Sequence, residues 1–173
     1  PGGERARLHL PEAVAAAEVA IERVGEPPEA LPVASAERFE RQVRALGAEG
    51  QATLAALSVG VVGAGGLGSH AIQQLLHLGV GELLVIDPDC VAVSNLSRLV
   101  GASARDARGG RAKVCLARRL ARHLGGATRV RTLRGSINEA QVGSQLLDCD
   151  LVIGATDTQW SRTVLNQIAY QYY

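Results

Sequence analysis

The feature that most constrains the fold is a glycine cluster that directly follows an apolar, β-branched run. Residues 58–62 read Ser-Val-Gly-Val-Val, residues 63–68 read Gly-Ala-Gly-Gly-Leu-Gly, and apolar residues then recur with helical spacing between Ala71 and Leu78. This order predicts a buried strand, a tight turn and a helix whose N-terminus faces the turn. Glycine amides can approach an anion closely, and a helix start adds unpaired N–H donors. The stretch therefore predicts a phosphate-binding loop with candidate nucleotide-binding residues Gly63, Gly65, Gly66 and Gly68.

A second apolar strand is predicted at residues 82–86, and it ends on Asp87. This acid lies 19 residues after Gly68, where a carboxylate can accept a hydrogen bond from a ribose hydroxyl. The Gly63-x-Gly65-x-x-Gly68 spacing with such an acid is also the fingerprint of dinucleotide-binding proteins. The two strands thus predict a nucleotide site, and they leave both ATP and a nicotinamide dinucleotide open as its ligand.

Helical and strand patterns alternate along the rest of the chain. This alternation predicts an α/β fold class, with a doubly wound, Rossmann-like, mostly parallel sheet and a helical N-terminal lead-in. Because the carboxyl ends of parallel strands meet at one edge, we expect Gly63, Asp87 and Asp157 to converge on one crevice. The predicted strands are 58–62, 82–86, 128–133 and 151–155, and the predicted helices are 11–24, 36–46, 51–57, 71–78, 111–124, 138–147 and 158–173.

The first 35 residues are expected to be separate from the nucleotide-binding part. The helix predicted at 11–24 is followed by a proline-rich linker at 25–32, which breaks any helix and fits the tail of a preceding domain. Residues 36–173 form the expected nucleotide-binding domain. We expect this domain to be truncated at its C-terminus, because the chain stops inside a predicted helix and contains no methionine.

Composition excludes several classes of protein. The 173 residues carry a net charge of +1 and are 47% hydrophobic, and they contain no run of about 18 apolar residues that would predict a membrane span. The three cysteines, Cys90, Cys115 and Cys149, lie far apart without a CxxC pair. Neither a disulfide framework nor a zinc clasp is therefore predicted, a reducing cytoplasmic location fits, and each thiol is expected to pack rather than to catalyse.

Polar residues downstream of Asp87 favour a triphosphate over a nicotinamide. Asn95, Arg98 and Lys113 follow the acid, whereas a hydride-transfer site calls for apolar walls. Lys113 is the only lysine in a chain with 17 arginines, and its compact charge suits phosphate oxygens. Each residue also has an ordinary explanation, because asparagine often caps a turn and basic side chains are usually solvated. Only their combination favours ATP.

With these residues in place, the sequence resembles the ThiF/MoeB family, the adenylation domains related to ubiquitin-activating enzymes. The resemblance runs from about residue 38 to 173 in the family's order and spacing. It implies ATP- and Mg²⁺-dependent adenylation of a carboxylate, the C-terminal glycine of a ubiquitin-like or sulfur-carrier protein, giving acyl-AMP and pyrophosphate. The matching blocks are Arg41-Gln42, Gly63-Ala64-Gly65-Gly66-Leu67-Gly68-Ser69, Asp87-Pro88-Asp89-Cys90-Val91, Ser94-Asn95-Leu96-Ser97-Arg98, Lys113-Val114 and Thr156-Asp157 with Arg162.

The resemblance also implies roles for single residues. Gly66 is expected to approach the nucleotide and Asp87 to hold the ribose. Asn95, Arg98 and Lys113 are expected to contact the phosphates. Cations spread around a triphosphate supply the positioning and charge neutralisation that nucleotidyl transfer needs, and a carboxylate nucleophile needs no general base.

Two further roles are implied on either side of this set. Asp157 is the implied Mg²⁺ ligand, and Thr158 stands where the family often has asparagine. Arg41 resembles an arginine that reaches into the partner's ATP site, so a homodimer or pseudo-dimer is implied. The candidate catalytic residues are Arg41, Arg98, Lys113 and Asp157, and the candidate nucleotide-binding residues are Gly63, Gly65, Gly66, Gly68, Asp87, Asp89, Ser94, Asn95, Arg98, Lys113, Asp157 and Thr158.

Three further functions stay open beside adenylation of a carrier protein. Residues 98–134 hold eleven Lys or Arg residues and a single acid, Asp106, which fits a tRNA-modifying member of the same family. A solvated basic face is favoured over an RNA surface, because no aromatic residue interleaves there. The glycine fingerprint keeps an NAD-dependent oxidoreductase open, and a catalytically silent scaffold subunit is the third possibility. Intact Arg98, Lys113 and Asp157 count against a silent subunit.

Overall fold

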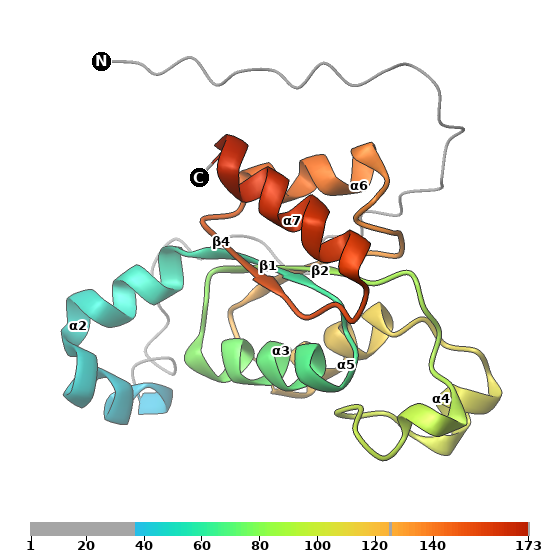
Figure 1. Ribbon diagram of the computed structural model, residues 1–173. Helices are drawn as coiled ribbons and strands as arrows, with labels where there is room; N and C mark the ends of the chain where they lie inside the picture. The colour runs from blue at the N-terminus through green and yellow to red at the C-terminus, as the bar shows by residue number, and fades with distance from the viewer. Residues whose placement is uncertain (1–36, 125, 173) are drawn as a thin grey trace.

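The computed structural model describes residues 37–124 and 126–172, which form a sheet covered by helices on both faces (Figure 1). The predicted α/β fold class is confirmed, while the helix and linker expected within residues 1–35 lie outside the described residues. In chain order the elements are α2 Glu40–Ala56, β1 Ser58–Val62, α3 Gly66–Leu78, β2 Glu82–Ile86, the 3₁₀ turn η1 Val93–Asn95, α4 Ala104–Arg108, α5 Val114–Leu124, β3 Arg129–Leu133, α6 Ala140–Gly143, the 3₁₀ turn η2 Ser144–Asp148, β4 Leu151–Gly154 and α7 Gln159–Tyr172.

The sheet has four strands in the order β3-β2-β1-β4, and each neighbouring pair is parallel. From β1 the chain winds outward through β2 to β3, and it then returns to place β4 on the other side of β1. The register sets Val61 opposite Val85 in β2 and Ile153 in β4. The strand order therefore reverses at β1, and open α/β sheets bind ligands at the carboxyl ends of the strands at such a reversal.

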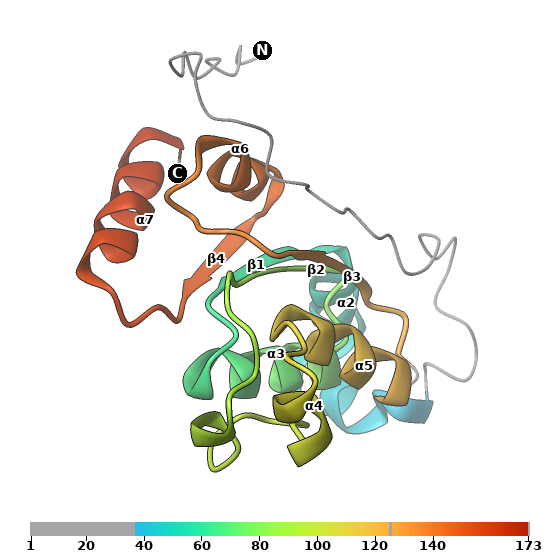
Figure 2. The same cartoon turned by 90° about the vertical axis from the view of Figure 1, so that its right-hand side faces the viewer.

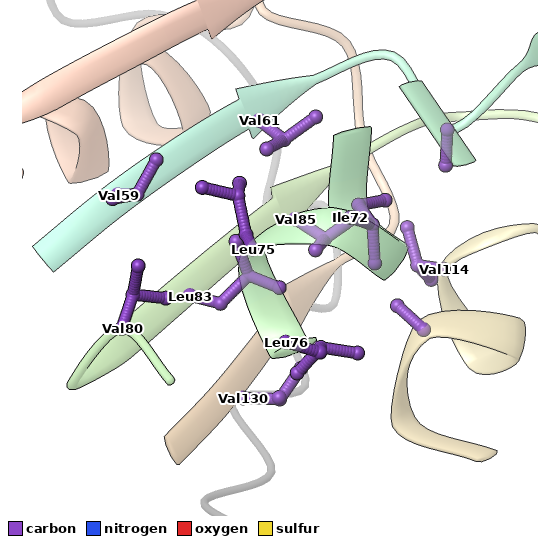
Figure 3. Close-up of a cluster of buried hydrophobic side chains, with 12 residues drawn as sticks. Val59, Val61, Ile72, Leu75, Leu76, Val80, Leu83, Val85, Val114 and Val130 are labelled. Atoms are coloured by element: carbon purple, nitrogen blue, oxygen red, sulfur yellow. The ribbon is translucent and has the colours of Figure 1, made fainter. Parts of the chain in front are cut away.

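Alternation along the strands gives each face of the sheet its own core. Val59 and Val61 of β1 point to the same face as Leu83 and Val85 of β2, and all four are fully buried. Figure 3 shows these side chains meeting Leu75 and its neighbours on α3. Burying a side chain of this size stabilises the fold by about 1.5–3 kcal/mol, so this cluster firmly fixes α3 and its glycine-rich start to the sheet.

The opposite face is covered by α6, η2 and α7, as the side view makes clear (Figure 2). Val62 and Ile86 pack here together with Leu146 of η2. Gly60 permits the close approach of η2, since a Cβ at this position would lie 2.7 Å from Leu146 Cδ2. Helices on both faces confirm the predicted double winding.

The predicted strands agree with the structure to within a residue at each end, whereas several predicted helices do not. The helices predicted at 36–46 and 51–57 are both present within α2, which is divided by a kink at Gly47, where the φ of +76° is not helical. The helix predicted at 111–124 begins only at Val114, because Ala112 pairs with Cys90 in an antiparallel bridge. The helix predicted at 138–147 is divided into α6 and η2. Among the described helices, none has the length and apolarity needed to cross a membrane.

Candidate functional site

A cleft of about 710 Å³ opens at the carboxyl ends of β1, β2 and β4. Gly63, Asp87 and Asp157 all line it, so the predicted convergence of these three residues is confirmed. The cleft lies at the reversal of strand order, where the fold favours ligand binding. The other predicted site residues on its wall are Gly65, Gly66, Asp89, Asn95, Arg98, Lys113 and Thr158.

The glycines of the loop differ in their structural roles. Gly63 has a φ of +96°, and a Cβ there would lie 2.6 Å from the Ala155 carbonyl oxygen. A Cβ on Gly68 would lie only 1.8 Å from the Gly63 carbonyl oxygen, so this buried glycine lets α3 pack against the loop. Gly68 does not line the cleft, whereas a Cβ on Gly65 would have no described atom within 4 Å. Gly65 thus leaves backbone open to a ligand at the N-terminus of α3.

Asp87 is buried, and its carboxylate ties two strand exits together. Oδ2 accepts a hydrogen bond from the Ala64 amide at 2.6 Å, and Oδ1 accepts one from the Asp89 amide at 2.8 Å. Burial raises the pKa of Asp87, while these two hydrogen bonds and the nearby charge of Lys113 act in the opposite direction. The carboxylate therefore holds the glycine loop against the end of β2, in addition to facing the cleft.

Lys113 reaches the cleft from the residue just before α5. Its ammonium lies 2.7 Å from Asp89 Oδ2, and its backbone amide donates to the Asp89 carbonyl at 2.9 Å. The lysine side chain is only 11% exposed. Lys113 therefore lines the cleft as an enclosed cation, which is suited to an anionic ligand.

Arg98 extends over the first turn of α3. A Cβ on Gly66 would come within 3.1 Å of Arg98 Cδ, and the guanidinium donates to the Ser94 carbonyl at 2.9 Å. Asn95 lines the cleft, and its side-chain oxygen also accepts from the Ala92 amide at 3.0 Å. Ser94 does not line the cleft; its part in the site is the carbonyl that orients Arg98.

The segment after β4 supplies the third wall. Asp157 is exposed on this wall, and its carboxylate has no hydrogen-bond partner among the described residues. Thr158 precedes α7, and its hydroxyl accepts from the Ser161 amide at 3.3 Å and also contacts the Ser161 hydroxyl. Arg162 lines the cleft and donates to the Thr156 carbonyl. Two helix N-termini, those of α3 and α7, therefore border the cleft beside three cationic side chains.

The segment between Arg98 and Lys113 is held by a buried acid, Asp106. Arg119 donates to both of its oxygens at 2.8 Å, and Ser103 donates to Oδ2 through its hydroxyl at 2.6 Å. Arg111 adds an ion pair at 2.9 Å. These hydrogen bonds, first that of Arg119 and then that of Ser103, hold the pKa of Asp106 well below its ordinary value. Several residues of the basic stretch thus serve this internal network.

Arg41 lies away from the cleft of its own chain. It is an exposed residue of α2, whose neighbouring side chains contact the C-terminal end of α3. Phe39 packs against Gly79, and Gln42 donates to the His77 carbonyl at 3.1 Å. The glycine loop is at the other end of α3 (Figure 1). The described chain therefore does not bring Arg41 together with Arg98, Lys113 and Asp157.

One wall of the cleft was not anticipated from the sequence. Ile86 and Ile137 lie behind this wall with their side chains buried, and Gly135 and Ser136 border it after β3. The position of residues 135–137 directly behind a predicted strand was the available signal, because every strand exit on this edge contributes to the crevice. The exit of β3 therefore contributes backbone and a small polar side chain to the cleft beside the cations.

No preformed metal centre is present: within residues 37–124 and 126–172, no three His, Cys, Asp or Glu side chains are grouped as metal ligands. This is compatible with Mg²⁺, which is commonly held by one or two carboxylates together with substrate phosphates. The unpartnered carboxylate of Asp157 offers a hard oxygen ligand of that kind. Cys90 and Cys115 are partly buried and Cys149 is buried, as expected for packing thiols.

The chain belongs to the ThiF family, which its sequence matches over residues 39–173. It is similar to the SAMP-activating enzyme E1 of Haloferax volcanii, with 36% identity over 140 residues, 80% of this chain and 51% of that protein. It is also 36% identical to the sulfur carrier protein adenylyltransferase of Thermus thermophilus over 77% of this chain and 49% of that protein. The molybdopterin-synthase adenylyltransferase of Escherichia coli shares 34% identity over 75% and 52%, respectively.

Solved structures agree with this family. The ATP complex of the Escherichia coli tRNA N6-threonylcarbamoyladenosine dehydratase TcdA superposes with a TM-score of 0.72 at 27% identity, covering 82% of this chain and 57% of that one. The chain thus spans about half the length of the curated relatives it matches. The fold and the family are established on this basis, and the resemblance seen in the sequence is confirmed.

Proposed function

We propose that this chain is the nucleotide-binding part of an enzyme that adenylates a carboxylate with ATP and Mg²⁺. The carrying observation is the gathering of Arg98, Lys113 and Arg162 around a cleft bordered by the N-termini of α3 and α7. Cations and helix N-termini around one cavity are suited to a polyphosphate and poorly suited to a hydride-transfer site.

The proposed chemistry is displacement of pyrophosphate from the α-phosphate of ATP by a substrate carboxylate. Arg98 and Lys113 would bind the phosphate oxygens, and Asp157 would hold Mg²⁺, which neutralises charge on the phosphates when bound. Asp87 keeps the glycine loop in place and offers its remaining acceptor capacity to the ribose. Because a carboxylate is already ionised, no side chain of the cleft has to remove a proton.

The substrate we favour is the C-terminal glycine of a sulfur-carrier or ubiquitin-like protein. Support comes from the relatives named above, which act as activating enzymes or adenylyltransferases of such carriers or of molybdopterin synthase. The structural similarity to a tRNA dehydratase supports a tRNA nucleoside carboxylate as the second candidate. Within the basic stretch, Arg119 and Arg111 are engaged by Asp106, and Arg129 and Arg131 by Glu82, which weakens the case for an RNA surface there.

The proposal is tested by ligand-dependent melting and by exchange of labelled pyrophosphate into ATP with the full-length protein. We expect ATP with Mg²⁺ to raise the melting temperature and NAD(H) to leave it unchanged. Exchange should depend on a carrier protein ending in glycine and be lost when that glycine carboxylate is amidated. Stabilisation by NAD(H) alone would favour an oxidoreductase, and exchange supported by bulk tRNA but by no carrier would favour the second candidate.

A further inference from the structure

The two side chains of the ion pair between Lys113 and Asp89 differ in solvent exposure. The lysine side chain is 11% exposed, whereas the aspartate side chain is 63% exposed. Both residues line the cleft. The Lys113 ammonium is therefore enclosed at a fixed position. The Asp89 carboxylate is the member of the pair that is exposed to solvent and to an incoming ligand.

The backbone keeps the two segments together without the help of these side chains. The Lys113 amide donates to the Asp89 carbonyl at 2.9 Å, and the Val91 amide donates to the Arg111 carbonyl at 2.8 Å. Cys90 and Ala112 form the bridge between them. Removing the Asp89 carboxylate should therefore leave the backbone of Lys113 in place and free only its side chain.

Asp89 is itself fixed from the glycine loop. Its amide donates to Asp87 Oδ1, and Asp87 Oδ2 accepts from the Ala64 amide. The ammonium of Lys113 is thus connected to the glycine loop through two successive aspartates. This arrangement fixes the cation relative to the same loop that the nucleotide is proposed to approach.

We propose that Asp89 is a positioning residue that holds the Lys113 ammonium in place before a polyphosphate enters the cleft. This inference rests on the proposed adenylation, and it separates Asp89 from the metal. A lysine side chain has four rotatable bonds, and fixing them in advance removes an entropic cost from the reacting complex. Asp89 then acts through Lys113, whose ammonium its carboxylate contacts at 2.7 Å, rather than by contact with Mg²⁺.

The test is a double-mutant cycle with Asp89→Ala and Lys113→Ala in the full-length protein. We expect Asp89→Ala to lower kcat of pyrophosphate exchange by about tenfold, within the range of coupling between contacting residues, with a much smaller change in the KM for ATP. In the Lys113→Ala background the same change should have no further effect. Independent, multiplying effects, or an Asp89→Ala enzyme with wild-type kcat, would overturn the proposal.

A conservative variant separates positioning from metal binding. Asp89→Asn keeps an oxygen that can accept from the Lys113 ammonium but removes the negative charge that strengthens binding of a divalent cation. We expect it to recover part of the kcat lost in Asp89→Ala, with an unchanged Mg²⁺ concentration for half-maximal activity. Equal losses in the two variants, together with a raised Mg²⁺ requirement, would assign Asp89 to the metal instead.

Chemical labelling tests the proposal without relying on catalysis, because Lys113 is the only lysine in these 173 residues. Acetic anhydride labelling, read by mass spectrometry of the peptide that contains Lys113, should be faster in Asp89→Ala than in the wild type, because the amine no longer has to leave its carboxylate partner. Identical labelling rates would overturn the positioning role. If the wild type showed no pyrophosphate exchange at all, the proposed adenylation would fail, and the labelling comparison would still decide whether Asp89 restrains Lys113.

Discussion

Gly66 lies directly under the side chain of Arg98, so that a Cβ on the glycine would come within 3.1 Å of Arg98 Cδ and 3.3 Å of Cγ. The neighbour that must move is a flexible, exposed side chain and not backbone. Gly66→Ala should therefore leave the fold intact and displace the guanidinium from its contact with the Ser94 carbonyl. We expect unchanged thermal stability and an ATP affinity lowered about tenfold, a loss of one charge-assisted contact, measured by calorimetric titration. An unchanged affinity would mean that the position of Arg98 held by the Ser94 carbonyl does not contribute to ATP binding.

Gly65 and Gly68 form a matched pair in the same loop. Gly65 has an ordinary φ of −78° and open space around it, whereas a Cβ on Gly68 would meet the Gly63 carbonyl oxygen at 1.8 Å. Gly65→Ala should fold normally and weaken ATP binding, because the methyl group occupies the path of the ligand. Gly68→Ala should lower the free energy of unfolding by about 3 kcal/mol, as overpacking does when backbone must shift. Urea denaturation and ATP titration of both variants test these expectations. Equal free energies of unfolding for the two variants would contradict a packing role that Gly68 has and Gly65 lacks.

Asp157 should be required for chemistry and not for folding. Its carboxylate is exposed and has no hydrogen-bond partner among the described residues, so Asp157→Asn should unfold at the wild-type urea concentration. Pyrophosphate exchange should fall at least about a hundredfold if this charge holds the Mg²⁺ that neutralises the phosphates. Exchange at a near wild-type rate, with the same Mg²⁺ dependence, would transfer the metal to another cleft residue.

Arg41 provides a test of assembly. Since it lies at the far end of α3 from the cleft of its own chain, any contact with the phosphates has to come from a second chain. Arg41→Ala should lower adenylation at least about tenfold, or about 1.4 kcal/mol in the barrier. Mixing Arg41→Ala with Asp157→Asn should restore part of the activity, because one of the two mixed sites then carries both intact residues. No restoration, with subunit exchange demonstrated by mass spectrometry, would reject action across an interface.

Asp106 gives the pH dependence of stability a definite direction. Its pKa is lowered in the folded protein from an ordinary value of 3.8, so its stabilising effect is fully present above about pH 4 and is lost as the pH falls below it. Asp106→Asn should therefore lower the free energy of unfolding at pH 7 by about 1–3 kcal/mol, as expected for lost charge-assisted hydrogen bonds. The difference from wild type should shrink toward pH 2, measured by urea denaturation across this range. A difference independent of pH would indicate lost packing instead.

The strands and the crevice were predictable because their signals are local. β-branched runs end at Gly63 and Asp87, and parallel strand exits must share an edge. The start of α5 was not predictable from the sequence. Backbone hydrogen bonds join Arg111 and Lys113 to the segment that follows β2, and they keep both residues out of the helix. Pairing of Asp89 with Lys113 was equally invisible, because it depends on that same bridge. A sequence pattern shows the periodicity within a helix or strand. It does not show whether a distant segment will form backbone hydrogen bonds with the residues expected in the first turn of a helix.

The double engagement of Asp87 restricts how this scaffold can acquire a new nucleotide preference. An amide at this position would turn an N–H group toward the Ala64 or Asp89 amide, and a longer acid would push the glycine loop away from β2. Exchanging the residue proposed to meet the sugar would therefore disrupt the loop proposed to meet the phosphates. A lineage under selection for another nucleobase would more readily vary the segment behind β3, where Ser136 borders the cleft and its hydrogen bonds stay within residues 136–139.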